Sequence, residues 1–183
     1  EPTVRRDLIE IVNLGRRYGL KPRVVTNGLR LADEAYCEEL CKAGVRFRLA
    51  IDGRTPDIYR RLRNNPGVCD KKLRALANLK KYSRRKHSLL CCAAKGVNDE
   101  AIADLIACCH EHIDVVNNLS LLPLAETWTP GTYEGATATT PEDAEKMIQA
   151  SLPGEEVEFV PAGLVHNLRR VRSFFQTSHR FDR

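Results

Sequence analysis

The protein has 183 residues, and 29 Lys and Arg against 24 Asp and Glu give a formal net charge of +5. This length suits one domain, and 43% hydrophobic with 29% charged residues is ordinary globular usage, which excludes a disordered or collagen-like chain. No apolar run approaches the roughly 20 residues that cross a bilayer, and residues 1–6 lack the apolar core of a signal peptide. The sequence predicts a folded protein without a transmembrane segment.

The distribution of charges indicates which partners to expect, and the cysteines indicate the cellular compartment. Basic residues are dispersed among acidic ones, without the clustered stripe of a nucleic-acid-binding protein, so we expect no nucleic-acid partner. The seven cysteines include the adjacent pairs Cys91-Cys92 and Cys108-Cys109, which lie in apolar stretches and not in a spaced disulfide framework. We therefore expect a cytoplasmic protein. Because the chain starts at Glu1-Pro2 and not at Met, we also expect it to be part of a longer one.

The first half of the chain alternates helical and strand periodicity. Apolar residues at helical spacing predict a helix over 4–18, and residues 22–25 follow as a short buried strand. The turn Thr26-Asn27-Gly28 comes next, and then a helix over 33–41 and a strand over 45–51. Each predicted helix therefore leads into a strand.

The same alternation continues to Pro123. Helices are predicted over 57–63 and 71–82, a strand over 87–93, a helix over 101–112 and a fourth strand over 115–122. Strands separated by helices of this length indicate βαβ units in a parallel sheet, hence an α/β fold. The turns at the carboxyl ends of the strands would share one rim, where such sheets carry their chemistry.

The remainder, 126–183, reads as an extension to a core of residues 1–125. Turn formers predict a loop over 126–135, and Thr140 with Pro141 starts a helix that ends at Ala150. We expect a short strand over 157–161 and a final helix over 164–175.

No metal site is predicted from the cysteines and histidines. Cys37 and Cys41 form a single pair on a helix without a partner pair, and His110 and His112 point apart on a helix end, so buried thiols and a solvated end are the better interpretation. Neither a glycine-rich phosphate loop nor a serine nucleophile elbow is present. What remains is polar residues at strand ends, which taken alone are typical of turns and helix caps.

Taken together, these turns resemble the motifs of one enzyme family in their order and spacing. Glu1-Pro2-Thr3 is similar to the end of the Gly-Gly-Glu-Pro loop of the radical S-adenosylmethionine (SAM) enzymes, Thr26-Asn27-Gly28 to their third-strand turn, and Ala50-Ile51-Asp52-Gly53 to their fourth-strand end. Residues 69–81 and the turn 95–99 resemble the subgroup of archaeal pterin dimethyltransferase-like proteins and tetraether lipid synthases. The resemblance runs from Glu1 to about Pro123.

The resemblance implies an incomplete TIM-type barrel, a parallel sheet of (β/α)₆ type with helices on one outer face. It also implies S-adenosylmethionine and a [4Fe–4S] cluster held by a Cys-x-x-x-Cys-x-x-Cys loop, which this chain lacks, so the ligands are expected upstream of Glu1. The resemblance implies that backbone groups of Glu1 and Pro2 contact the methionine ammonium and that the backbone at Leu122 and Pro123 flanks the adenine. Further residues implied to contact the cofactor are Thr26 or Asn27 and Asp52 at the amino-acid or ribose part, with Asn98 in a similar role and Lys95 beside them.

The implied activity is reductive cleavage of SAM to a 5′-deoxyadenosyl radical, used for methylation or carbon–carbon bond formation on a small-molecule or lipid substrate. An electron donor such as flavodoxin or ferredoxin would be the partner. Two alternatives stay open. One is a peptide-modifying enzyme of the same superfamily, which would need a Cys-rich C-terminal extension, and the other is a catalytically silent binding module.

Overall fold

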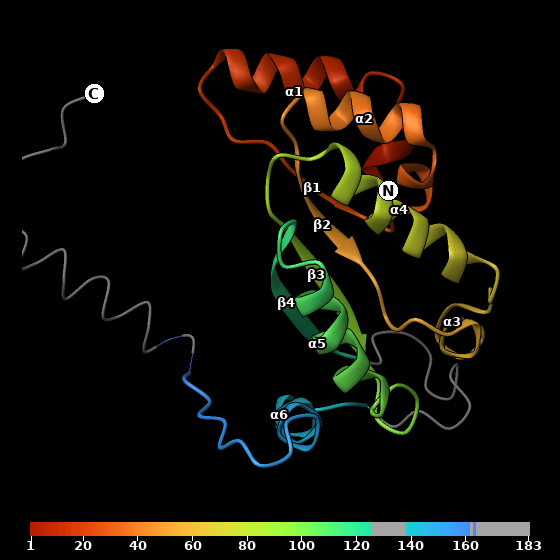
Figure 1. The fold of residues 1–183 in the computed structure, drawn as a ribbon, viewed down its shortest axis with the longest axis vertical. Coiled ribbons are helices and arrows are strands. Elements are labelled where there is room, and N and C mark those ends of the chain that lie inside the picture. The colour runs from red at the N-terminus through yellow and green to blue at the C-terminus, as the bar shows by residue number, and fades with distance from the viewer. Residues whose placement is uncertain (126–137, 162, 164–183) are drawn as a thin grey trace, which may run out of the picture.

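The computed structural model describes residues 1–125, 138–161 and 163 of the protein. Four strands, β1 (Arg23–Thr26), β2 (Arg46–Ala50), β3 (His87–Ala93) and β4 (Val116–Pro123), form one sheet in the order β1-β2-β3-β4 (Figure 1). Every neighbouring pair is parallel. The predicted α/β class and parallel sheet are confirmed.

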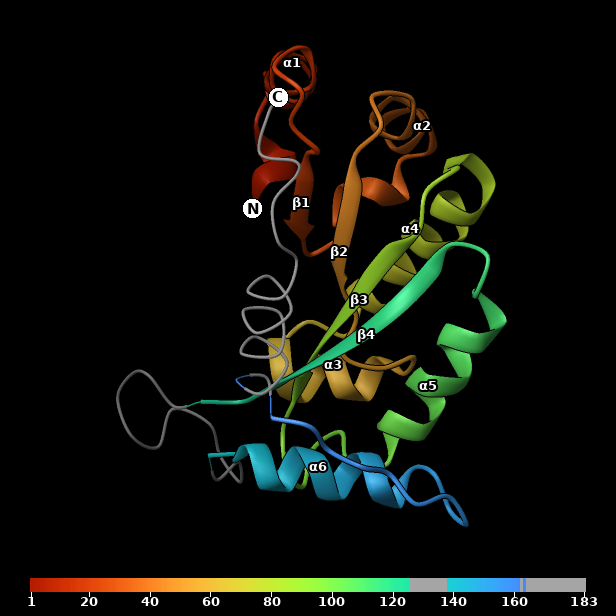
Figure 2. The ribbon, with the colours of Figure 1, turned by 90° about the vertical axis from the view of Figure 1, so that its left-hand side faces the viewer.

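The strand order places the connecting helices on one side of the sheet. Each strand is added at the same edge, and connections between parallel strands are right-handed, so successive crossovers cover the same face. Figure 2 shows α2, α4 and α5 together on the same side of the sheet, as in a barrel wall and unlike a doubly wound sheet. The helices are α1 (Leu8–Arg17), α2 (Glu34–Lys42), α3 (Pro56–Arg63), α4 (Val68–Tyr82), α5 (Ala101–Glu111) and α6 (Pro141–Ala150), with two short 3₁₀ helices, η1 (Pro2–Val4) and η2 (Leu29–Ala32).

The core lies between the sheet and these helices. Alternate strand residues point into it, so that Val24, Phe47, Leu89 and Val116 are buried on successive strands. Helix side chains complete the same cluster, among them Leu40, Leu76 and Leu105. The buried thiols of Cys37, Cys91 and Cys108 belong to this cluster too, which agrees with the interpretation of cysteines as core residues.

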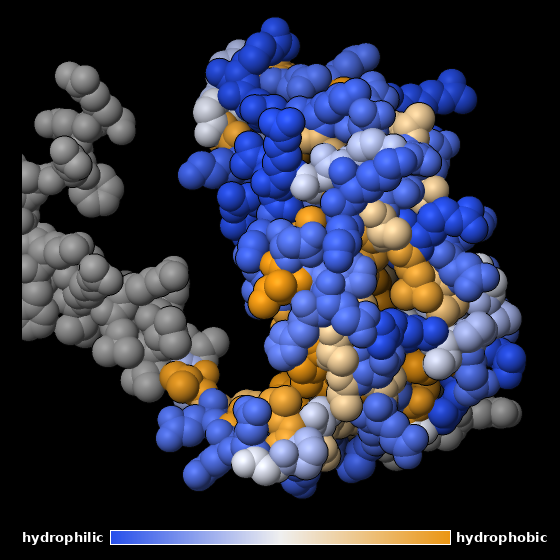
Figure 3. Space-filling view, in the orientation of Figure 1, coloured by the Kyte–Doolittle hydropathy of each residue, from blue (hydrophilic) through white to orange (hydrophobic). Residues whose placement is uncertain are grey.

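The other face of the sheet, which we call the open face, is not covered by any described helix and faces the viewer in Figure 2. By contrast, the outer surface over α1 and α2 is mostly hydrophilic, as expected of solvated helices (Figure 3). The open face consists of alternate strand residues, namely Arg23, Val25, Arg46, Arg48, Ala50, Ser88, Leu90, Cys92, Asn118, Ser120 and Leu122.

After β4, the structure matches the elements predicted from the sequence only in part. Helix α6 begins at the predicted cap: the Thr140 hydroxyl accepts from the Asp143 backbone N–H at 3.1 Å, and the Asp143 carboxylate accepts from Thr140 in return. The strand predicted over 157–161 is wrong, because the Val157 N–H donates to the side chain of Gln149 and not to a sheet. The loop predicted over 126–135 and the helix over 164–175 lie outside the described residues. No described helix combines the length and apolarity needed to cross a bilayer.

Candidate functional site

Glu1 is the centre of a hydrogen-bonded group at the carboxyl end of β1. Its Oε1 accepts from the Thr3 N–H at 3.0 Å, the Thr3 hydroxyl at 2.6 Å and the Thr26 hydroxyl at 2.7 Å, and its Oε2 accepts from the Asn27 N–H at 2.7 Å. Burial raises the pKa of this carboxyl, but the four hydrogen bonds outweigh it, and the net pKa lies below the usual range. Glu1 is therefore an anion at neutral pH, held in a fixed orientation.

The turn Thr26-Asn27-Gly28 presents this group to the pocket beside it. The Thr26 hydroxyl accepts from the Gly28 N–H, and Asn27 Oδ1 accepts from the Leu29 N–H, both at 3.0 Å. Gly28 has φ +80°, and a Cβ there would lie 2.2 Å from Cδ1 of Leu49. The turn therefore requires glycine at this position, which explains the sequence signature physically.

A pocket of about 500 Å³ opens next to Glu1, between the ends of β1 and β2 and the start of α4. This volume lies within the range of small-molecule sites. Its lining residues are Glu1, Pro2, Val25, Thr26, Asn27, Leu29, Ala50, Arg63, Asn65, Val68 and Lys72. Four of the predicted site residues, Glu1, Pro2, Thr26 and Asn27, therefore meet at one pocket.

Lys72, which the sequence reasoning missed, supplies a buried cation to this pocket. Only 4% of the residue is exposed, and its Nζ donates to the carbonyl oxygens of Asn27 at 2.9 Å and Ala50 at 2.6 Å. It also lies 5.5 Å from the ring centroid of Tyr59. Burial lowers the pKa of Lys72 to about 8, against an ordinary value of 10.5. A signal existed in the sequence, since Lys72 shares helical spacing with the apolar Cys69, Leu76 and Leu79.

Asp52 is fully buried just after the end of β2, and its carboxylate connects this strand end to Arg63 on α3 and to Cys92 on β3. Its carboxylate accepts from Arg63 Nε at 3.0 Å and Arg63 Nη2 at 3.2 Å, and from the Cys92 N–H at 2.9 Å. Arg63 in turn lines the pocket that contains Glu1. Asp52 is thus one side chain removed from that pocket in this structure.

Asn98 lies beside Asp52, and both polar atoms of its side-chain amide form hydrogen bonds with backbone groups. Its Nδ2 donates to the carbonyl oxygens of Asp52 at 3.0 Å and Cys92 at 2.9 Å, and its Oδ1 accepts from the Ala94 N–H at 2.8 Å. The residue is 2% exposed. Asn98 therefore ties the carboxyl ends of β2 and β3 together.

The other predicted residues lie apart from Glu1. Lys95 Nζ pairs with the Asp143 carboxylate at 2.9 Å, and the Lys95 N–H donates to the Thr139 hydroxyl, so Lys95 connects β3 to α6. Leu122 is half exposed on the open face, where it is the register partner of Cys92, and Pro123 is the partner of Ala93. The structure brings neither Lys95 nor Leu122 to the pocket next to Glu1.

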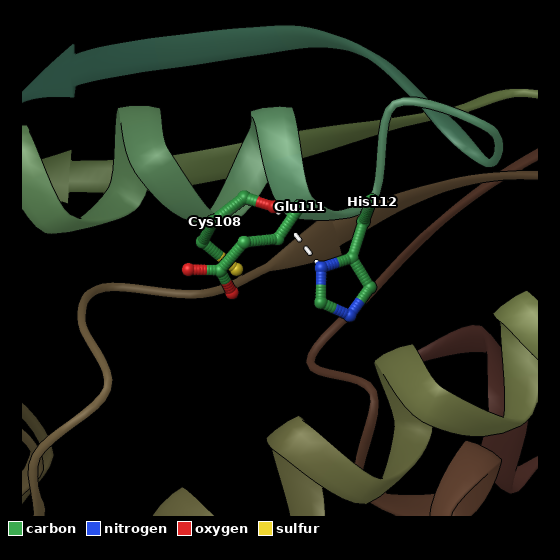
Figure 4. Close-up of side chains that lie close together, drawn as sticks. All are labelled: Cys108, Glu111 and His112. Carbon is green, nitrogen blue, oxygen red and sulfur yellow. Dashed lines mark hydrogen bonds between the residues drawn. The ribbon is translucent and has the colours of Figure 1, made fainter.

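No three thiols lie close together among the described residues. Among these residues one group of possible metal ligands lies close together, Cys108, Glu111 and His112 at the end of α5 (Figure 4), and it contains a single thiol. The Nδ1 atom of His112 is engaged with the Cys108 carbonyl oxygen at 3.1 Å, and the Arg54 guanidinium already pairs with Glu111 at 2.7 Å. A guanidinium beside the carboxylate disfavours a second cation there.

The comparisons with known proteins agree with this geometry. Residues 1–109 match the Radical SAM superfamily. A 7,8-dihydro-6-hydroxymethylpterin dimethyltransferase of Methanocaldococcus jannaschii is 30% identical over 169 residues, which cover 88% of this chain and 33% of that protein. A probable GTP 3',8-cyclase of Thermococcus kodakarensis is 33% identical over 108 residues, 58% of this chain and 34% of that protein.

A third relative, an AdoMet-dependent heme synthase of Methanosarcina barkeri, is 35% identical over 82 residues, 44% of this chain and 23% of that protein. The chain thus spans about a third or less of the length of these relatives. The family match nevertheless covers more than half of the chain, and the parallel sheet with helices on one face is the architecture that the resemblance implied. The chain belongs to the radical SAM superfamily.

Proposed function

We propose that these residues form part of a radical SAM enzyme and that the pocket beside Glu1 holds the amino-acid part of S-adenosylmethionine. The observation that carries the proposal is the oriented Glu1 carboxylate, whose Oε2 accepts a single hydrogen bond from the described residues. A carboxylate oxygen with free lone pairs suits the ammonium group of an amino acid, since charge-assisted hydrogen bonds are among the strongest.

The charges around the pocket also suit a zwitterion. Lys72 and Arg63 line the same pocket as Glu1, so it presents both signs of charge to one ligand. The ammonium would contact Glu1 and the backbone at Pro2, and the carboxylate would face the cationic side chains. Thr26 and Asn27 hold Glu1 in place through the hydrogen bonds described above.

Asp52 and Asn98 fit a supporting role most directly, because their polar atoms contact Arg63 and backbone groups of neighbouring strand ends. The direct contacts to the cofactor that the resemblance implies for these residues, and for Lys95, Leu122 and Pro123, remain predictions. Substitution of each residue in the cofactor-binding assay tests them.

The [4Fe–4S] cluster does not fit the described cysteines. Cys37 is fully buried on α2 with only Cys41 beside it, and no three thiols lie together among the described residues. We propose that its ligands belong to a part of the protein outside these 183 residues. In this superfamily the cluster supplies the electron for reductive cleavage of SAM, while the protein binds the cofactor, orients it and excludes water.

We propose methylation or carbon–carbon bond formation on a small-molecule or lipid substrate in the cytoplasm, with flavodoxin or ferredoxin as electron donor. The relatives support this range, since one is named a dimethyltransferase and another a cyclase. The test is anaerobic incubation of the cluster-loaded full-length protein with SAM and dithionite. Formation of 5′-deoxyadenosine is expected. A protein that binds neither cluster nor SAM would instead be a silent binding module.

A further inference from the structure

Three arginines lie together on the open face of the sheet. Arg23 and Arg46 are register partners on β1 and β2, and Arg48 follows two residues later on the same face of β2. All three residues are exposed. Residues two apart in a strand are separated by roughly 7 Å and paired strands by about 5 Å, so the three long side chains can converge on one small group.

These three arginines have no acidic partner among the described residues, in contrast to several other basic residues of the protein. Arg5, Arg54 and Arg60 each pair with an aspartate, whereas Arg23, Arg46 and Arg48 form no ion pair with any described carboxylate. The open face itself contains no acidic residue. Its positive charge is therefore not balanced within the described part of the chain.

The surroundings add hydrogen-bond donors and more positive charge. Ser88 is the register partner of Arg48, and Asn118 is the partner of Ser88, so neutral polar groups extend the row across the sheet. At the amino end of the strands, a pocket of about 370 Å³ has Arg16, Lys21, Arg46 and Arg85 in its lining and no acidic residue. Burial and the charge of Arg46 lower the pKa of His87 to about 4.

From this arrangement we infer that the open face binds a phosphoryl group of the substrate through Arg23, Arg46 and Arg48. Guanidinium groups match phosphate oxygens in paired hydrogen bonds, and several of them at short spacing suit one compact polyanion. A polynucleotide would need cations spread along the length of its backbone. The inference rests on the proposed function in one respect, since it takes the ligand to be the molecule on which the enzyme acts.

The test measures pyrophosphate binding to the full-length protein by calorimetry, without SAM. Removing one charge-assisted contact costs about 1.4 kcal/mol, so Arg46→Gln and Arg48→Gln should each weaken binding roughly tenfold. Arg74→Gln is the matched control, because Arg74 is exposed on α4, which covers the opposite face. It should leave binding unchanged. All three positions are exposed, so the variants should fold, and a melting curve verifies this.

Equal losses in all three variants would show a nonspecific charge effect and overturn the inference. Wild-type binding that Arg46→Gln and Arg48→Gln do not weaken would overturn it too, and so would a single-stranded RNA oligonucleotide that displaces pyrophosphate at lower concentration. SAM binding, measured separately, distinguishes the two proposals. If pyrophosphate binds through these arginines and SAM does not bind, the proposed function fails while the anion site stands. If SAM binds and pyrophosphate does not, only the anion site fails.

Discussion

The ammonium group of Lys72 lies 2.6 Å from the carbonyl oxygen of Ala50, and this single contact connects helix α4 to the end of β2. The same Nζ donates to Asn27 at the end of β1, so one buried side chain fixes the distance between two strand ends. Glu1 is anchored to the end of β1 through the Asn27 N–H. The shape of the proposed cofactor pocket therefore depends on a lysine that was not among the predicted site residues.

The buried Lys72 should make stability depend on pH in the alkaline range. Folding lowers its pKa from 10.5 to about 8, so between these values the unfolded chain binds more protons than the folded protein. The free energy of unfolding should therefore rise with pH across that window, by up to roughly 3 kcal/mol from this group. Chemical denaturation of wild type and Lys72→Met at pH 7.5 and pH 10 measures the difference. If the difference in unfolding free energy between the two proteins stayed constant with pH, this would contradict a lowered pKa of Lys72.

Gly28→Ala should destabilise the protein more than Gly19→Ala. Both glycines have positive φ, of +80° and +76°, so both substitutions strain the backbone by about 1 kcal/mol. A Cβ at Gly28 also collides with Leu49, while one at Gly19 meets nothing within 4 Å. We expect an additional cost of roughly 1–3 kcal/mol at Gly28, measured by denaturant titration. Equal effects would mean that the turn can relax away from β2.

Asn98→Ala should lower stability by roughly 2–4 kcal/mol, because it leaves three buried backbone groups without their hydrogen-bond partner. Asn117→Ala, at an exposed position on β4, is the control and should have little effect. Thermal melting and SAM affinity are measured on the same samples. A loss of affinity with unchanged melting would instead assign Asn98 a direct contact with the cofactor.

Cys37→Ala should leave the iron content of the full-length, reconstituted protein unchanged. Cys37 is fully buried in the core with Cys41 one helical turn away, and no third thiol accompanies them. Iron and sulfide analysis with the visible absorption spectrum checks this. Loss of the cluster in a variant that otherwise keeps the wild-type melting temperature would show that Cys37 is a ligand.

The sequence predicted the sheet and helices of residues 1–125 well, because buried strands such as His87–Ala93 alternate with helices of clear periodicity. The family resemblance implied Glu1, Thr26 and Asn27 as site residues, and the structure places them in hydrogen-bond contact although Glu1 is distant from the other two in sequence. Lys72 and Arg63 were missed, since their place in the site depends on how α3 and α4 pack against distant strand ends. Val157 shows the opposite failure: an apolar pattern suited to a strand finds no sheet partner and bonds to Gln149.

The most direct test of the account is the affinity of the cluster-loaded, full-length protein for SAM, measured by anaerobic calorimetry in wild type and Glu1→Gln. The substitution removes the negative charge and places the side-chain amide of glutamine, in place of the carboxylate, next to the Asn27 N–H. We therefore expect the affinity for SAM to fall at least roughly tenfold. Glu10→Gln, at an exposed position on α1, should bind as wild type does. An unchanged affinity in folded Glu1→Gln protein would contradict the proposal that this carboxylate holds the cofactor.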